Sequence, residues 1–487
     1  MTIRPSDNMT IRPLDKKVLV ICYHYPPSPH ATPYPTRSWV KYLPKFGWQP
    51  IVLTRNWNTD TYVKDINTNC IVYKTPYKEY FGKIVKLQQT IRLKIPLKAG
   101  LLNKPLNFIL LNFIFHPDSE RGWYPYAYRA GLSIIKEHPI SVILSVGAPW
   151  TDHWIASNLH KRTGIPWIAD YRDPWTQDIS IKRSKKWFIR DKVHRVIEKK
   201  NCQSASCFIH ASKIWTNQLS QLLGIKGHTI PNGFDPEDFT NLPEYNLRLN
   251  LTNSEIFTLS YIGTLHFTQK LDVFFIGFKE FILENRISPE NCKIRFVGTG
   301  SIEILHNLRS NLFKSVDRYV EFIPCVPKNE AIKYMLQSHV LLLFLNDDRG
   351  WYPTKLFEYL ACCSGPVPMQ NISGAETKKL RQGGRQILAT PDNGGVVKEL
   401  LDETHSGITL NTSSEVANWL KEKYKNFIAQ SDANPNDKPQ ILPPQRDPEK
   451  SGTIPKSNME HPAMAVIDKF SRVIQTHKLA QILNYES

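Results

Sequence analysis

The chain has 487 residues, of which 41% are hydrophobic and 22% charged, and its formal net charge is +18. This length allows two domains with buried cores, and the composition excludes wholesale disorder. The N-terminal residues show no secretory signal, and the longest apolar cluster, 106–115, is too short to span a bilayer. We therefore expect a flexible segment at 1–16 and a cytoplasmic protein, either soluble or peripheral on the inner face of the plasma membrane.

Two segments concentrate the positive charge. Residues 81–110 contain six basic and no acidic side chains, and residues 182–200 contain nine basic side chains against Asp191 and Glu198. Because Lys and Arg alternate there with apolar residues, contact with an anionic membrane surface is one expectation, and a solvated helix face is the other. No nucleic-acid-binding motif accompanies the charge, so no nucleic acid is expected.

The eight cysteines are scattered along the chain. The closest are Cys202 with Cys207 and Cys362 with Cys363, and neither spacing matches a pair of zinc ligands. We expect reduced, mostly buried thiols, with neither a metal nor a cofactor.

The first half of the chain alternates apolar strands with helical patterns, which is typical of βαβ units. The expected strands are 17–24, 50–54, 140–145 and 166–170, and the expected helices are 36–46 and 152–161. A Pro-rich loop at 25–35 follows the first strand.

A second series of the same kind follows Pro231. Its expected strands are 257–263, 293–298, 320–323 and 340–345, and its expected helices are 271–284, 301–312 and 329–337. The fold class is therefore α/β, with two tandem Rossmann-like doubly wound domains, at 17–230 and 231–428, and a cleft between them. Residues 429–459 have the composition of a disordered linker, and 460–487 contain an amphipathic helix near 463–483.

Polar residues follow the strands of the second domain, where such sheets bind ligands. Gly263-Thr264 and the segment from Gly298 to Gly300 end two strands, and glycine there lets the backbone approach a phosphate. Lys270 could neutralise a diphosphate, although an isolated lysine is more often plain surface. Glycine turns without a ligand are also common.

Lys355 and Glu358 lie three residues apart at a helix start marked by Pro353. The carboxylate could accept both ribose hydroxyls while the lysine reaches a diphosphate. A surface salt bridge between the two side chains explains the spacing equally well.

In the first domain, Asp170, Arg172 and Asp173 crowd the carboxyl end of a buried strand. Three charges there are costly unless they pair or bind a ligand. We take all three as catalytic candidates, and a structural Asp–Arg pair that closes the loop is the alternative.

Several motifs occur in the order typical of one enzyme family. They include Lys-Tyr-Leu-Pro-Lys-Phe-Gly-Trp at 41–48, Ile-Pro-Trp-Ile-Ala-Asp-Tyr-Arg-Asp-Pro-Trp-Thr at 165–176, Ile-Pro-Asn-Gly-Phe-Asp-Pro-Glu-Asp-Phe at 230–239 and Lys-Leu-Phe-Glu-Tyr-Leu-Ala at 355–361. From 17 to 401, and again in the closing helix, the chain resembles glycosyltransferase family 4. This resemblance implies the GT-B architecture, a last helix that crosses back to the first domain, and retaining, metal-independent transfer from a nucleotide sugar.

The resemblance also implies roles for individual residues. Glu358 matches the ribose-binding glutamate, Lys355 and Lys270 match the diphosphate contacts, and the glycines lie near the nucleotide. Loops of the first domain would face a glycan or lipid-linked glycan acceptor, with Tyr25, Arg37 and Trp150 on that side and Asp173 orienting the acceptor. The chain departs from the family pattern in a proline-rich first loop, in Thr264 where arginine is common, and in Gly350 where the family has a first glutamate.

The expected function is glycosyl transfer from a nucleotide diphosphate sugar. A sugar-nucleotide epimerase of the same architecture is one alternative. A non-catalytic nucleotide-binding scaffold is the other, and Gly350 is its best argument.

Overall fold

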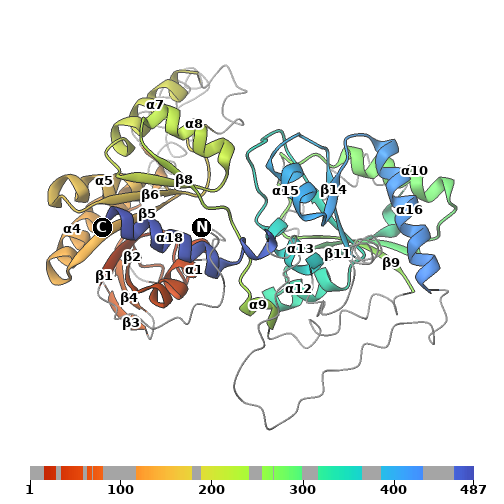
Figure 1. Ribbon diagram of the computed structural model, residues 1–487, viewed down its shortest axis with the longest axis horizontal. Coiled ribbons are helices and arrows are strands. Elements are labelled where there is room, and N and C mark those ends of the chain that lie inside the picture. The colour runs from red at the N-terminus through yellow and green to blue at the C-terminus, as the bar shows by residue number, and fades with distance from the viewer. Residues whose placement is uncertain are drawn as a thin grey trace, which may run out of the picture. The chain divides into compact units, whose positions relative to one another are not determined.

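The computed structural model describes residues 16–28, 34–58, 63–67, 70–79, 117–177, 188–240, 255–266, 268–298, 316–364, 385–431 and 466–487. The chain divides after Asn232 into two compact units, and α18 (Arg472–Glu486) belongs to the first of them (Figure 1). Among the described helices, none is both long and apolar enough to cross a bilayer.

The first unit contains an eight-stranded sheet in the order β3-β4-β2-β1-β5-β6-β7-β8. Its strands are β1 (Lys16–Ile21), β2 (Trp48–Arg55), β3 (Val63–Asn67), β4 (Cys70–Thr75), β5 (Ile140–Gly147), β6 (Trp167–Tyr171), β7 (Cys207–His210) and β8 (Gly227–Thr229). Its helices are α1 (Tyr34–Tyr42), α4 (Tyr124–Glu137), α5 (Thr151–Thr163), α7 (Phe188–Cys202), α8 (Lys213–Leu223) and α18, with 3-10 turns η1 (Leu43–Phe46) and η4 (Ser119–Trp123). Only β3 in this sheet runs antiparallel to its neighbour.

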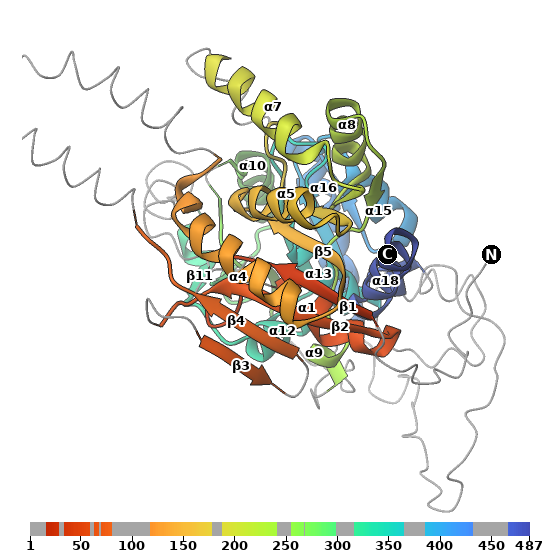
Figure 2. The ribbon, with the colours of Figure 1, turned by 90° about the vertical axis from the view of Figure 1, so that its left-hand side faces the viewer.

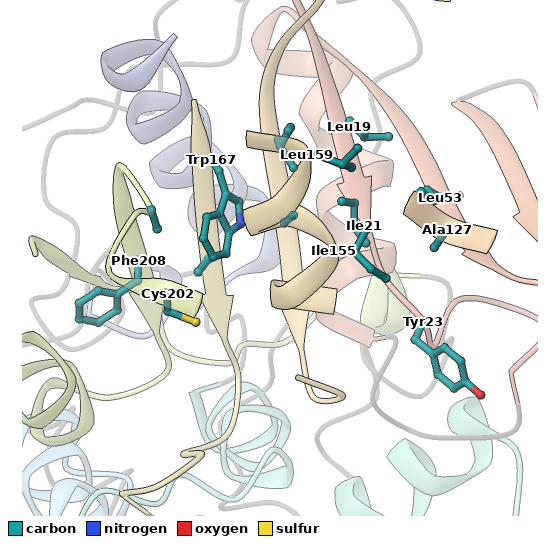
Figure 3. Close-up of a cluster of buried hydrophobic side chains, with 14 of the residues drawn as sticks. Leu19, Ile21, Tyr23, Leu53, Ala127, Ile155, Leu159, Trp167, Cys202 and Phe208 are labelled. Atoms are coloured by element: carbon teal, nitrogen blue, oxygen red, sulfur yellow. The ribbon is translucent and has the colours of Figure 1, made fainter. Parts of the chain in front are cut away.

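Helices cover both faces of this sheet, because alternate residues of each buried strand point to opposite faces. Leu19 and Ile21 of β1 pack with Leu159 of α5 on one face (Figure 3). Figure 2 shows helices α4 and α5 lying over this face. Val18 and Val20 pack on the other face, in a cluster with side chains from α1 and α18.

The second unit contains a parallel six-stranded sheet in the order β11-β10-β9-β12-β13-β14. Its strands are β9 (Phe257–Ile262), β10 (Cys292–Val297), β11 (Val320–Ile323), β12 (Val340–Phe344), β13 (Gln386–Thr390) and β14 (Gly407–Thr409). Its helices are α9 (Glu237–Thr240), α10 (Asp272–Glu284), α12 (Lys328–Leu336), α13 (Lys355–Ser364), α15 (Val396–Thr404) and α16 (Ser413–Ser431), with a 3-10 turn η8 (Asp317–Tyr319). Helices α10 and α16 pack in one core cluster, and α12, α13 and α15 pack in another, so this sheet is also doubly wound.

Four expected boundaries need correction. Lys16 already belongs to β1, and α16 continues to Ser431, into the expected linker. The helix expected over 36–46 begins at Tyr34 and ends in the 3-10 turn η1. The closing helix begins at Arg472 because the backbone N–H of Phe234 bonds the carbonyl of Phe470, which lies outside α18. Segment 81–110, the helix expected at 301–312 and residues 432–459 lie outside the described residues.

Candidate functional site

The second sheet reverses its strand order beside β9, and the loops after β9 and β12 therefore lie at a topological switch point. In open α/β sheets, ligands bind outside the carboxyl ends of the strands at such a point. The β9 loop begins at Gly263, and the β12 loop leads into α13 at Lys355. The sheet thus brings Gly263, Thr264, Lys270, Lys355 and Glu358 to one region of the unit.

Gly263 and Gly298 end neighbouring strands with left-handed backbone, at φ +111° and +72°. Their N–H groups are already in use, because Gly263 donates to Val297 and Gly298 donates to Ile323. The two glycines therefore do not offer free donors to a phosphate. What Gly263 provides is space, since a Cβ there would lie 3.1 Å from the Lys355 Nζ. Gly300 lies outside the described residues.

Lys355 is half-buried beneath the β9 loop. Its Nζ lies 3.6 Å from the centroid of the Tyr261 ring and 3.5 Å from the carbonyl oxygen of Thr264. Burial holds the pKa of the Lys355 amine well below its usual value, against the opposing effect of the Glu358 carboxylate. An anion placed beside this amine would restore its charge.

Glu358 lies one turn further along α13, and its carboxylate forms an ion pair with Lys328 at the start of α12. The salt bridge considered from the sequence, between Lys355 and Glu358, is therefore not the one that forms. Only 16% of the Glu358 side chain is exposed. Lys328 was missed in the sequence, because only the fold brings α12 beside α13.

The two remaining donor-side candidates make local contacts. The Lys270 Nζ lies 2.5 Å from a carboxylate oxygen of Asp347, with half of the lysine side chain exposed. Thr264 is exposed, and its carbonyl accepts a 2.9 Å hydrogen bond from the Tyr261 hydroxyl. Asp348 accepts a bond from the Gly350 N–H at 2.8 Å, so this carboxylate shapes its own loop.

In the first unit, Asp170 and Arg172 form a buried ion pair beneath α1. The indole N–H of Trp39 donates to the second Asp170 oxygen at 3.1 Å. Burial raises the pKa of the Asp170 carboxyl, and Arg172 opposes that effect. These contacts support the structural alternative for the pair, whereas Asp173 is exposed at the same loop.

The acceptor-side candidates come from neighbouring loops of the first sheet. Tyr25 follows β1, Trp150 follows the adjacent strand β5, and Arg37 is exposed on α1. The Trp150 ring stacks on Trp175 with 5.1 Å between centroids. Trp175 is buried, so of these two rings Trp150, which is half-buried, provides aromatic surface at the carboxyl edge of this sheet.

Two aspartates at the same edge were missed in the sequence. Asp152 accepts a 2.8 Å hydrogen bond from the Tyr23 N–H with one oxygen, and its other oxygen is buried and has no hydrogen-bond partner in the described part of the chain. Asp118 accepts from both the N–H and the hydroxyl of Thr151, and burial raises its pKa to about 6. Asp152 follows Pro149, Trp150 and Thr151, which resembles an ordinary helix start, so the sequence carried no signal for it.

No family model and no curated protein matches the sequence. Solved structures match its fold. A sucrose-phosphate synthase from Thermosynechococcus elongatus has a TM-score of 0.58 at 13% identity, covering 97% of this chain and 100% of the other. The protein therefore has the GT-B fold.

Two further structures with this fold show the same level of similarity. A UDP-forming trehalose-phosphate synthase from Burkholderia xenovorans has a TM-score of 0.57 at 10% identity, covering 97% of this chain and 99% of the other. Anabaena HepE, solved in complex with UDP and glucose, has a TM-score of 0.51 at 12% identity, covering 96% and 100%. At such identities the similarity establishes the GT-B fold and does not by itself extend those activities to this chain.

Proposed function

We propose that the protein is a glycosyltransferase that moves a sugar from a nucleotide diphosphate donor to a glycan or lipid-linked glycan acceptor. The observation that carries the proposal is the position of Lys355 and Glu358, one helical turn apart on α13, at the switch point of the second sheet. Lys355 is an amine that forms no ion pair among the described residues, where its Nζ contacts the Tyr261 ring and the Thr264 carbonyl, and Glu358 is a carboxylate one helical turn away. A diphosphate and a ribose are the neighbouring groups that this pair fits.

In this proposal the second unit binds the nucleotide. Lys355 stabilises the negative charge that develops on the leaving diphosphate, and Lys270 adds a second cation by exchanging Asp347 for the phosphate. Glu358 exchanges its contact with Lys328 for the ribose hydroxyls. No metal is required for this charge stabilisation, because two lysines supply it.

The first unit supplies the acceptor side. Asp173 is the exposed carboxylate that would orient the acceptor hydroxyl, and the buried Asp170–Arg172 pair fixes its loop. Trp150, which is half-buried and stacks on the buried Trp175, offers an aromatic face for a sugar ring. In a retaining front-side transfer, the leaving phosphate accepts the proton of the acceptor hydroxyl, so no separate general base is assigned.

A transfer assay tests the proposal. The full chain is incubated with labelled UDP, GDP and dTDP sugars, with and without a lipid-linked glycan fraction, and nucleotide release and label transfer are measured. We expect acceptor-dependent release with one donor, reduced about a hundredfold in Lys355→Met and unchanged in Lys279→Met, an exposed lysine of α10.

Other outcomes identify the alternatives. Conversion of the sugar nucleotide without release of the nucleotide would show an epimerase. Nucleotide binding without turnover on any acceptor would show a scaffold, for which Gly350 in place of a glutamate is the argument from the sequence.

A further inference from the structure

Three side chains with metal-binding atoms meet at the sheet edge of the first unit. They are Cys207 at the start of β7, His228 in β8, and Glu486 at the end of α18. Their ligand atoms all lie within 4.8 Å of one another. In the described part of the chain, these three side chains form the group whose ligand atoms lie close enough together to hold a metal ion.

The fold, and not the sequence spacing, assembles this group. Strands β7 and β8 are parallel neighbours, with Phe208 opposite Gly227 and Ile209 opposite His228. Helix α18 then brings Glu486 to the same place from the other end of the chain. Because Cys207 begins β7, the group does not belong to the carboxyl-end loops described above.

The chemistry of the three side chains suits zinc. A thiolate, an imidazole nitrogen and a carboxylate oxygen are its usual protein ligands, at about 2.0–2.3 Å from the metal. Three protein ligands leave a fourth tetrahedral position for water. A tetrahedral site with these bond lengths separates its ligand atoms by about 3.3–3.8 Å, so atoms that now lie within 4.8 Å of one another must move closer to bind the ion.

Cys207 and His228 are each in an environment that suits a bound cation. Burial and the neighbouring Glu486 carboxylate raise the pKa of the Cys207 thiol to about 12, while Lys226 acts in the opposite direction. The Nε2 atom of His228 is buried and has no hydrogen-bond partner among the residues that the structure describes. Burial lowers the pKa of His228, so its imidazole is in the neutral form that binds metals.

We propose that Cys207, His228 and Glu486 bind one zinc ion that fastens the end of α18 to the β7–β8 edge. The ion replaces the proton of the Cys207 thiol and the hydrogen bond between this thiol and Glu486. Its role is to hold a helix in place, because the group is separate from the residues proposed for sugar transfer. The Lys226 side chain does not fill the place of the zinc ion, because its Nζ lies 5.0 Å from the centroid of the Tyr485 ring.

Metal content tests this proposal directly. The tag-free full chain is dialysed with zinc, then against buffer containing a weak chelator, and bound zinc is measured. We expect one zinc per chain in the wild type and in Cys325→Ser, which removes an exposed thiol elsewhere. Cys207→Ser and His228→Gln should each lose it, and cobalt in its place should give a thiolate charge-transfer absorption band only when Cys207 is present.

Two results would contradict the proposed zinc site. Wild-type protein that retains no zinc, or retains equal zinc in His228→Gln and Cys207→Ser, would do so. The wild-type measurement tests the proposal without any variant, so the proposal can be rejected even if a variant folds poorly. Glu486→Gln offers a mild third variant near the end of the chain, and it should weaken zinc retention and reduce the rise in melting temperature on zinc addition.

Discussion

At the scale of single residues, the candidate donor site depends on the absence of a side chain at Gly263. This residue combines a backbone φ of +111° with a Cβ direction that points at the Lys355 amine. Any side chain there would strain the backbone and displace the lysine. The glycine therefore keeps Lys355 beneath the β9 loop.

We predict that Gly263→Ala lowers both stability and nucleotide affinity. The left-handed backbone should cost about 1–3 kcal/mol in the free energy of unfolding, measured by urea denaturation. Displacement of Lys355 should weaken nucleotide binding, measured by calorimetry.

Gly224→Ala is the matched control, because Gly224 has φ +73° and open space around its Cβ position. It should show a loss of stability with unchanged nucleotide affinity. Equal nucleotide affinity in the two variants would show that the absence of a side chain at Gly263 has no effect on nucleotide binding.

The sequence predicted the candidate-site residues that share one element and missed those that only the fold brings together. Helical spacing places Lys355 and Glu358 on one face of α13, and both are found there. The ion-pair partner of Glu358 is Lys328, from another helix, and no local sequence pattern predicts this contact. The Asp170–Arg172 pair could be foreseen as an alternative because two opposite charges at a buried strand end must compensate each other.

At the scale of elements, continuous apolar runs predicted the central strands correctly. Val340–Phe344, for example, is buried at every residue, as a strand with helices on both faces requires. The edge strands β8 and β14 have three residues each, too few to show a period. The start of α18 was also misplaced, because the turn before it is fixed by a distant contact between Phe234 and Phe470.

Helix α7 contains a buried acid that makes stability depend on pH. Glu198 accepts hydrogen bonds from the Thr176 hydroxyl at 2.5 Å and from the Gln177 amide at 3.2 Å. Burial raises the pKa of the Glu198 carboxyl to about 7, against the effect of these bonds. Between pH 4.5 and 7 the folded state therefore binds more protons than the unfolded state, so this contribution to stability is lost as pH rises.

We predict that Glu198→Gln removes this loss, because the amide cannot ionise and its oxygen still accepts from Thr176. The free energy of unfolding of the variant, relative to wild type, should rise by about 3 kcal/mol between pH 4.5 and 8. Urea denaturation at several pH values measures it. Asp191→Asn, in the same helix, should show no such gain, and a gain equal to that of Glu198→Gln would contradict the assignment.

At the scale of the whole molecule, the net charge of +18 is explained either by an anionic binding partner or by a surface on which the charged side chains are solvated. Helix α7 carries part of one basic segment, with Lys199, Lys200 and the apolar Val196 exposed. An exposed helix of this composition fits an anionic lipid surface.

We predict that the protein sediments with vesicles containing anionic lipid, and that added salt releases it. Reversing two charges in Lys199→Glu/Lys200→Glu should weaken the binding. Lys421→Glu/Lys425→Glu, on the exposed face of α16, changes the net charge by the same amount and should weaken it less. Equal loss in both pairs would mean that the total charge, and not α7, governs the interaction.

The most direct test of the central claim is a thermal-shift measurement with UDP, GDP and dTDP on wild type, Glu358→Ala and Glu422→Ala. At a hundredfold excess over its dissociation constant, a true ligand should stabilise the fold by about 2.7 kcal/mol. We predict stabilisation by one nucleotide in wild type and in Glu422→Ala, an exposed control on α16, and its loss in Glu358→Ala. No stabilisation of the wild-type protein by any nucleotide would contradict the claim that this edge of the second sheet binds a sugar donor.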